Sequence, residues 1–131
     1  MGVTLPSDDG KRILVVDDEE AILFALQDVL ELPGVQVDGA ATKEEAFDLL
    51  RERHYTAVIA DLRLSGADEK EGFSVIQEAK RIDPSVKAVV ITAYGESGTR
   101  AQAFEFKADY YMEKPVSPHQ LVEVLRALGA Y

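Results

Sequence analysis

The stretch Thr56-Ala57-Val58-Ile59-Ala60-Asp61 is a short apolar run that ends on a carboxylate. Such a run, without alternation of polar residues, is typical of a strand buried on both faces in a parallel sheet. An earlier run, Ile13-Leu14-Val15-Val16, ends in the same way, on Asp17 and Asp18. The carboxyl ends of parallel strands share one edge of a sheet, and such folds bind their ligands there. We therefore expect the three carboxylates to lie close together.

Two further apolar runs place other polar groups at this edge. The run from Val86 to Ala93 carries Thr92 near its end, and the short run from Asp109 to Met112 is followed by Lys114. Carboxylates gathered together are costly unless a cation intervenes, and Mg²⁺ typically takes one or two carboxylates plus waters and phosphate oxygens. The whole set predicts a Mg²⁺ site for phosphoryl chemistry, with Asp61 as the acceptor and the lysine as a phosphoryl contact.

Between the strands the apolar period changes to three and four residues, which predicts amphipathic helices. The first begins at Glu19 and ends at Pro33-Gly34. Its apolar positions are Ile22, Ala25, Leu26, Val29 and Leu30. Thr42 and Ser117 are expected to cap two later helices, each with a capping box, and the others are expected near residues 72–82 and 99–106. Five strands alternating with five helices predict an α/β fold, a parallel sheet with helices on both faces.

The composition fits one soluble domain. The chain has 131 residues, of which 47% are apolar, and a net charge of -10, which argues against a general nucleic-acid binder. It has no cysteine, which excludes thiolate catalysis and Cys-ligated zinc. Neither a membrane span nor a signal peptide is visible, so we expect a cytoplasmic protein. Residues 1–11 are expected to form a flexible lead and residues 12–131 the domain.

Four segments together closely resemble the receiver domains of bacterial two-component response regulators. They are Ile13-Leu14-Val15-Val16-Asp17-Asp18-Glu19, Ile59-Ala60-Asp61-Leu62-Arg63-Leu64, Val90-Ile91-Thr92-Ala93-Tyr94-Gly95 and Ala108-Asp109-Tyr110-Tyr111-Met112-Glu113-Lys114-Pro115. One such segment says little, but four in the right order and strand positions are specific. The resemblance spans Arg12 to Leu128 and implies a flavodoxin-like, doubly wound sheet of strand order 2-1-3-4-5.

The resemblance implies a role for each acidic residue. Asp61 would accept a phosphoryl group from a sensor histidine kinase or a histidine phosphotransfer protein. Asp18 and Asp61 would bind Mg²⁺ directly, and Asp17 would act through a water molecule. The backbone carbonyl of Arg63 would complete the protein ligands.

The resemblance also implies a switch. Thr92 and Tyr111 match the pair whose hydroxyl and ring shift together on phosphorylation, and Lys114 matches the lysine that contacts the phosphoryl group. Pro115 follows this lysine, and its peptide bond is a candidate for the cis form. The switched surface would consist of the fourth helix, the fifth strand and the fifth helix. It would act on an output domain or partner protein, with a homodimer as one form of output.

Three departures from the family pattern stand out. The loop after Asp61 is about three residues longer than usual. Lys107 stands where a glycine commonly ends the fourth helix. Arg63 and Tyr94 are bulky residues two beyond Asp61 and Thr92, at positions that modulate the lifetime of the phosphoryl group, whereas the small Ala93 leaves the entrance open.

These features favour a phosphoacceptor switch that is not a metabolic enzyme and binds neither nucleic acid nor membrane. One alternative is an aspartyl-phosphate phosphatase of the haloacid type, which would carry an acid where Arg63 stands. Another is a flavin carrier, but the acidic run Asp17 to Glu20 would repel its phosphate. A third is a degenerate receiver used only for interaction, and the presence of all five site residues argues against it.

Overall fold

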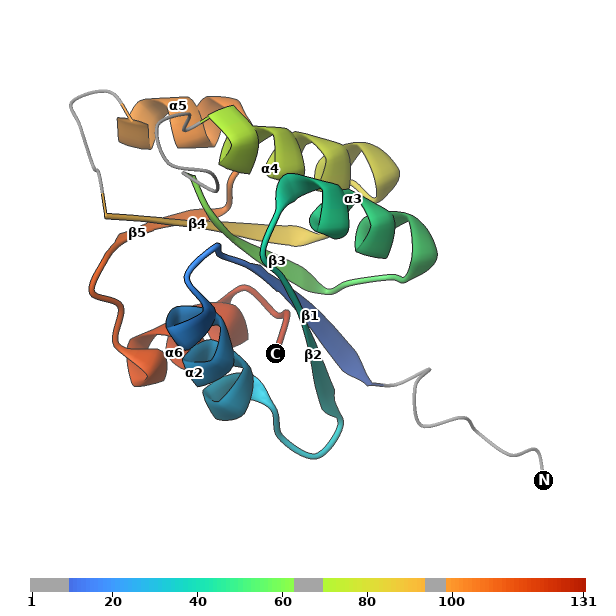
Figure 1. Cartoon of the computed structure of the whole chain (residues 1–131), viewed down its shortest axis with the longest axis vertical. Coiled ribbons are helices and arrows are strands. Elements are labelled where there is room, and N and C mark those ends of the chain that lie inside the picture. Colours follow the sequence, from blue (N-terminus) through green and yellow to red (C-terminus); the bar gives the residue numbers. More distant parts are fainter. Residues whose placement is uncertain (1–9, 63–69, 94–98) are drawn as a thin grey trace.

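In the computed structural model of this chain, five strands form one sheet and helices cover both of its faces (Figure 1). The structure describes residues 10–62, 70–93 and 99–131. Within these ranges the strands are β1 (Lys11–Val16), β2 (Val35–Ala40), β3 (Ala57–Asp61), β4 (Lys87–Thr92) and β5 (Tyr110–Glu113). The helices are α2 (Glu20–Leu30), α3 (Lys43–Glu52), α4 (Lys70–Ile82), α5 (Thr99–Glu105) and α6 (Pro118–Ala127). None of these helices is long and apolar enough to cross a membrane.

The strand order is β2-β1-β3-β4-β5, and every neighbouring pair is parallel, so the predicted order is confirmed. Val16 of β1 pairs with Ala60 of β3, and Asp61 pairs with Ile91 of β4. The residue after β1, Asp17, therefore lies at the same level as Asp61. The register by itself brings these carboxylates to one edge of the sheet.

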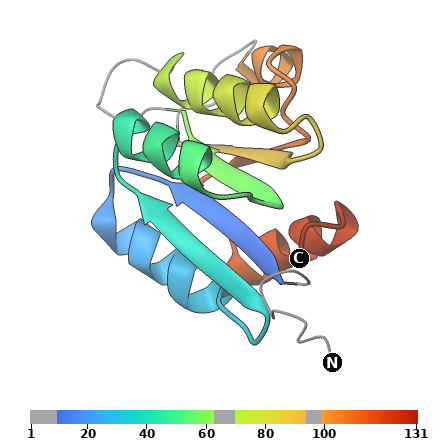
Figure 2. The same ribbon diagram turned by 90° about the vertical axis from the view of Figure 1, so that its right-hand side faces the viewer.

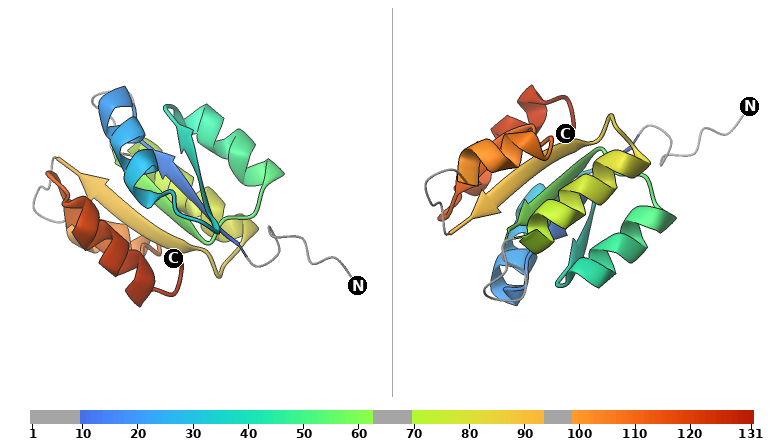
Figure 3. Two further views of the ribbon diagram at one scale, coloured as in Figure 1. Left: turned by 90° about the horizontal axis from the view of Figure 1, so that it is seen from below. Right: turned by 90° about the horizontal axis from the view of Figure 1, so that it is seen from above.

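Two apolar layers hold the helices to the sheet. Helices α2 and α6 cover one face, and α3, α4 and α5 cover the other (Figures 2 and 3). Successive strand residues point to opposite faces, so Leu14 and Val16 pack under the second group of helices while Ile13 and Val15 pack under the first. Burial on both faces explains why the strands read as unbroken apolar runs.

The helix starts follow the sequence closely. The Thr42 hydroxyl accepts a hydrogen bond from the Glu45 backbone N–H at 3.1 Å, and the Glu45 carboxylate accepts one from the Ala41 N–H at 3.0 Å. The first bond satisfies a donor that the first turn of α3 would otherwise leave unpaired, and the second ties the residue before the cap to that turn. At α6, Ser117 accepts from the Gln120 N–H at 3.3 Å.

Three details of the helices differ from the prediction. Helix α2 ends at Leu30, before the predicted end at Pro33-Gly34. Helix α4 begins at Lys70, two residues earlier than expected. In α2 the buried residues are Leu23, Leu26 and Leu30, whereas Ala25 and Val29 are exposed. Most positions of this helix are apolar, so the spacing of its apolar residues is compatible with two overlapping faces. Packing against the sheet selects which of the two is buried.

Candidate functional site

Two carboxylates and one ammonium meet at the carboxyl edge of the sheet. Asp17 follows β1, Asp61 is the last residue of β3, and Lys114 follows β5. The Lys114 Nζ donates a hydrogen bond to Asp61 Oδ2 at 2.9 Å and another to Asp17 Oδ2 at 3.0 Å. Their side chains are only 12%, 8% and 4% exposed for Lys114, Asp61 and Asp17. Three side chains that the sequence predicted to converge therefore form a partly buried cluster in which one ammonium contacts two carboxylates.

Glu19 adds a third carboxylate that the sequence reasoning did not assign to the site. Carboxylate oxygens of Asp17, Glu19 and Asp61 all lie within 4.8 Å of one another, an arrangement that could hold a metal ion. Glu19 precedes the first residue of α2 in extended conformation, and its backbone N–H donates to Asp17 Oδ1 at 2.9 Å. The signal in the sequence is its place directly after Asp17-Asp18, but a glutamate there also suits the first turn of a helix.

Asp18 is exposed and is not one of these three carboxylates. Desolvation by partial burial, and then repulsion from the neighbouring Asp17 carboxylate, raise the pKa of Asp18 above its usual value. For the pKa of Lys114, burial is outweighed by hydrogen bonds to charged neighbours. Burial by itself lowers the pKa of Lys114, but its hydrogen bonds to Asp61 and Asp17 outweigh burial and raise that pKa. The ammonium therefore stays charged, and the surrounding acids retain excess negative charge that suits a hard divalent cation.

The predicted switch residues lie on the strands next to Asp61. Thr92 is the last residue of β4 and is buried, and its backbone carbonyl accepts from the Lys114 N–H at 2.9 Å. Tyr111, in β5, is buried on the face covered by α5, with the Arg100 guanidinium 5.6 Å from its ring centroid. Ala93 is exposed. The peptide bond between Lys114 and Pro115 is cis.

Two of the predicted modulating residues, Arg63 and Tyr94, lie outside the described residues, as does most of the longer loop after Asp61. Lys107 is described, and it has the left-handed backbone expected of the glycine it replaces, with a φ of 75°. His54 and His119 are both exposed.

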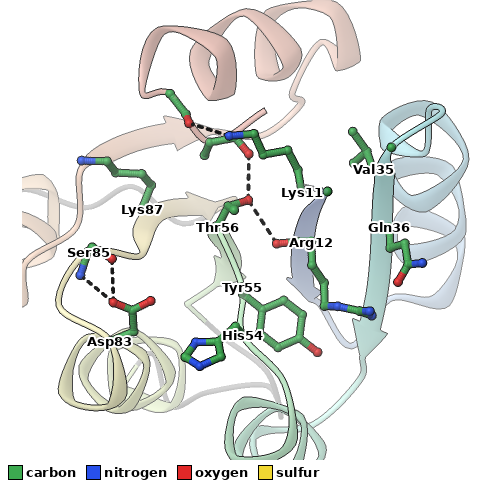
Figure 4. Close-up of a pocket in the computed structure, with 14 residues that line it drawn as sticks. Lys11, Arg12, Val35, Gln36, His54, Tyr55, Thr56, Asp83, Ser85 and Lys87 are labelled. Carbon is green, nitrogen blue, oxygen red and sulfur yellow. Dashed lines mark hydrogen bonds between the residues drawn. The ribbon is translucent and has the colours of Figure 1, made fainter. Parts of the chain in front are cut away.

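A cavity of about 500 Å³ lies at the opposite, amino-terminal edge of the strands (Figure 4). Several of its polar groups bond to the chain itself. Thr56 Oγ1 donates to the carbonyls of Arg12 and Ala130, and Lys11 Nζ donates to that of Gly129. This cavity is separate from the acidic cluster and contributes nothing to it.

Fold and cluster together define a flavodoxin-like α/β protein with an acidic, lysine-bridged site at the carboxyl ends of its strands. The model of the family described as "Response regulator receiver domain" matches residues 13–126, and the chain belongs to this family. It is thus a receiver domain of two-component response regulators, as the four sequence segments predicted.

Relatives and solved structures agree with this assignment. The chain is 34% identical over 117 residues to the transcriptional regulatory protein SrrA of Staphylococcus aureus (strain NCTC 8325 / PS 47). The match covers 89% of this chain and 47% of SrrA, so the chain spans about half the length of this relative. A response regulator receiver domain protein (CheY-like) from Methanospirillum hungatei JF-1 superposes with a TM-score of 0.82 at 30% identity, covering 92% of this chain and 94% of that one.

A third similar structure is a response regulator protein from Burkholderia pseudomallei, which contains a phosphorylated aspartic acid, a calcium ion and citrate. It superposes with a TM-score of 0.77 at 28% identity, covering 92% of this chain and 73% of that one. The predicted fold class and family are therefore confirmed.

Proposed function

We propose that Asp61 accepts a phosphoryl group, in a Mg²⁺-dependent reaction, from a sensor histidine kinase or a histidine phosphotransfer protein. The observation that carries this proposal is the buried Asp61 carboxylate, which Lys114 contacts at 2.9 Å beside a second buried carboxylate, Asp17. The similar Burkholderia pseudomallei protein carries a phosphorylated aspartic acid, which supports the same chemistry here.

The oxygen ligands around Asp61 fit Mg²⁺, which prefers carboxylates, carbonyls and water. The family resemblance assigns Asp18 and Asp61 as direct ligands of the ion, Asp17 as a ligand through a water molecule and the Arg63 carbonyl as the last protein ligand, whereas the carboxylates that lie within 4.8 Å of one another are those of Asp17, Glu19 and Asp61. When bound, Mg²⁺ supplies positive charge that stabilises the phosphoryl oxygens during transfer. The calcium ion in the Burkholderia pseudomallei protein supports a divalent cation in this family.

The chain's own residues would do the remaining work. A carboxylate oxygen of Asp61 forms the new O–P bond while the P–N bond to the donor histidine breaks. Lys114, already beside Asp61, neutralises the charge that develops on the transferred group. Thr92, at the end of the neighbouring strand, supplies a hydroxyl donor to the phosphoryl oxygens.

The output would be a shift in conformational population. In the phosphorylated state the Thr92 hydroxyl would donate a hydrogen bond to the phosphoryl group and Tyr111 would move with it, which changes the surface formed by α5, β5 and α6. That surface would engage an output domain, a partner protein or a second copy of the chain. This activity is a switch with slow intrinsic phosphotransfer and autodephosphorylation, so we do not class the domain as a metabolic enzyme. A cytoplasmic location, and the lack of direct nucleic-acid or membrane binding, stay predictions.

The proposal is tested with a small-molecule phosphodonor and intact mass spectrometry, in Mg²⁺ and in chelator. Wild type is compared with Asp61→Asn and with Asp48→Asn, a control whose carboxylate is 73% exposed on α3. We expect one added phosphoryl group in wild type and Asp48→Asn with Mg²⁺, and none in Asp61→Asn or in chelator. A wild type that binds Mg²⁺ but gains no phosphoryl group would instead indicate a receiver that signals without phosphorylation.

A further inference from the structure

We infer that Gly72, in the first turn of α4, is a positioning residue for the phosphoacceptor. This inference rests on the proposed function, because it concerns how Asp61 is held for phosphoryl transfer. Gly72 lies against the backbone of Asp61 and Leu62, and its N–H donates a hydrogen bond to the Leu62 carbonyl at 3.1 Å. The lack of a side chain is what lets α4 approach the end of β3 this closely.

The requirement for glycine here is steric and not conformational. Gly72 is not among the residues with left-handed backbone, which in the described part of the chain are Lys107, Gly34 and Gly129. A methyl group at Gly72 would lie 2.5 Å from the Leu62 Cα and 3.0 Å from the Asp61 carbonyl carbon, and closer still to the Asp61 carbonyl oxygen. These are backbone atoms, which cannot rotate aside as the end of a flexible side chain can.

Neither the end of β3 nor the first turn of α4 can easily move away from this contact. On the sheet side, Asp61 is held by its pairing with Ile91, and the Leu62 N–H donates to the Ile91 carbonyl at 3.3 Å. On the helix side, Phe73 and Ile76 anchor α4 in the core, with 3% and 0% of their surface exposed. A close-packed interior transmits such a displacement instead of absorbing it.

The displacement would reach the acceptor carboxylate. Relieving the overlap requires a shift of about 1 Å, which is enough to cost up to about a hundredfold in a reaction that depends on alignment. The contacts at risk are those that Asp61 makes with Lys114 at 2.9 Å and with the acidic residues around it. Gly72 thus acts on the reaction through the position of Asp61 and touches no reacting atom itself.

Gly39 provides a matched control. It is a glycine of the edge strand β2, and a methyl group there would meet only the side-chain end of Gln27, at 3.1 Å. That amide can move at little cost. Gly39→Ala therefore reproduces the change in backbone freedom and added methyl without pressing on Asp61.

The experiment measures phosphorylation of wild type, Gly72→Ala, Gly72→Ser and Gly39→Ala by a small-molecule phosphodonor, as a function of donor concentration. We expect both Gly72 variants to lose at least tenfold in maximal rate with an unchanged half-saturating donor concentration, and Gly39→Ala to stay within twofold of wild type. Thermal unfolding of each protein is followed in parallel. A folded Gly72→Ala that phosphorylates at the wild-type rate overturns the inference, and so does a Gly72→Ala that loses cooperative unfolding, because Gly72 would then serve the fold as a whole.

A calorimetric titration with Mg²⁺ separates this inference from the proposed function. If Gly72 positions Asp61, both Gly72 variants bind Mg²⁺ at least threefold more weakly than Gly39→Ala does. If the Gly72 variants bind Mg²⁺ more weakly but the wild-type protein is never phosphorylated, the positioning role is supported and the phosphoacceptor function is rejected. Equal Mg²⁺ affinity in all four proteins would reject the positioning role.

Discussion

The ammonium of Lys114 lies 2.9 Å from an Asp61 carboxylate oxygen and offsets the charge of the predicted acceptor. The same ammonium lies 3.0 Å from Asp17 and 3.4 Å from Glu19. These are the three residues whose oxygens could hold a metal ion. A divalent cation at these oxygens must therefore compete with Lys114 for the negative charge.

Lys114→Gln should strengthen Mg²⁺ binding and weaken phosphoryl transfer. Removing one competing positive charge beside the carboxylates is worth on the order of 1 kcal/mol, or roughly fivefold in affinity. The transfer rate should fall because the lysine no longer neutralises the transferred group. Calorimetry with Mg²⁺ measures the first effect and phosphodonor kinetics the second. Lys11→Gln is the control, since Lys11 bonds to Gly129 at the other edge, and weaker Mg²⁺ binding in Lys114→Gln would contradict the competition.

Asp18→Asn should stabilise the metal-free protein at neutral pH. The pKa of Asp18 is raised in the folded state, mainly by desolvation and then by repulsion from Asp17. The ionised form of Asp18 is therefore less stable in the folded chain than in the unfolded chain. Its ionisation therefore costs stability at neutral pH, and this cost disappears as the pH falls and Asp18 becomes protonated. Thermal unfolding across acidic to neutral pH measures the effect.

Two comparisons complete the Asp18 test. Mg²⁺ should raise the melting temperature of wild type more than that of Asp18→Asn, because the ion relieves the same repulsion. Asp28→Asn, on the exposed side of α2, should leave the melting temperature almost unchanged. A metal-free Asp18→Asn that melts below wild type at neutral pH would show that this carboxylate is stabilising, against the expectation.

The sheet and its acidic edge could be predicted because each depends on a local signal. Unbroken apolar runs require burial on both faces, and in a parallel sheet the residue after each run must lie at the carboxyl edge. Asp17, Asp61 and Lys114 therefore converge whatever the details of the helices. The buried face of α2 has no such signal, since Ala25 and Val29 fit the period as well as Leu23 does, and packing decides between them.

Glu19 and Gly72 show why the rest of the site could not be predicted. A glutamate just before a helix is already explained by its favourable interaction with the positive end of the helix dipole. Its position in the sequence therefore does not show that its carboxylate lies beside Asp61. The importance of Gly72 comes from a contact between backbones, the first turn of α4 and the end of β3. Such a contact depends on how closely α4 packs against β3, and this distance cannot be read from the order of residue types in the sequence.

Asp38→Asn should destabilise the protein at neutral pH and have little effect in acid. Asp38 accepts hydrogen bonds from Tyr55 at 2.7 Å, from Arg53 at 3.0 Å and from Arg12 at 3.2 Å. Burial alone would raise the pKa of Asp38, but these bonds outweigh it and lower that pKa. The stability it contributes is thus present above the unfolded pKa of 3.8 and is lost as the pH falls through the lower folded value.

Urea unfolding at neutral pH should show a loss of about 1–3 kcal/mol for Asp38→Asn, because Arg12 and Tyr55 lose a charged acceptor in a partly buried site. The gap to wild type should close below the folded-state pKa of Asp38. Asp48→Asn is the control, since its ion pair with Arg51 is exposed and spans 3.5 Å, and such pairs contribute little. A gap that stays constant with pH would assign the loss to packing instead of charge.

Lys107 and Gly129 end their helices with the same backbone geometry. Lys107 has a φ of 75° and Gly129 a φ of 78°. Around Lys107, the Ala108 N–H bonds to the Ala103 carbonyl and the Lys107 N–H to the Phe104 carbonyl, both at 3.0 Å. This pair of bonds is the Schellman motif, in which glycine is favoured because a Cβ is strained at positive φ.

Lys107→Gly should therefore raise stability by about 0.5–1 kcal/mol, the strain relieved less the extra freedom of glycine in the unfolded chain. Gly129→Ala is the reciprocal test and should lower stability by about 1 kcal/mol through backbone strain alone, because a methyl group there meets nothing within 4 Å. Urea unfolding of both variants measures these changes. Opposite signs would show that φ governs both helix ends, whereas a destabilised Lys107→Gly would mean that the lysine side chain contributes more than its backbone strain costs.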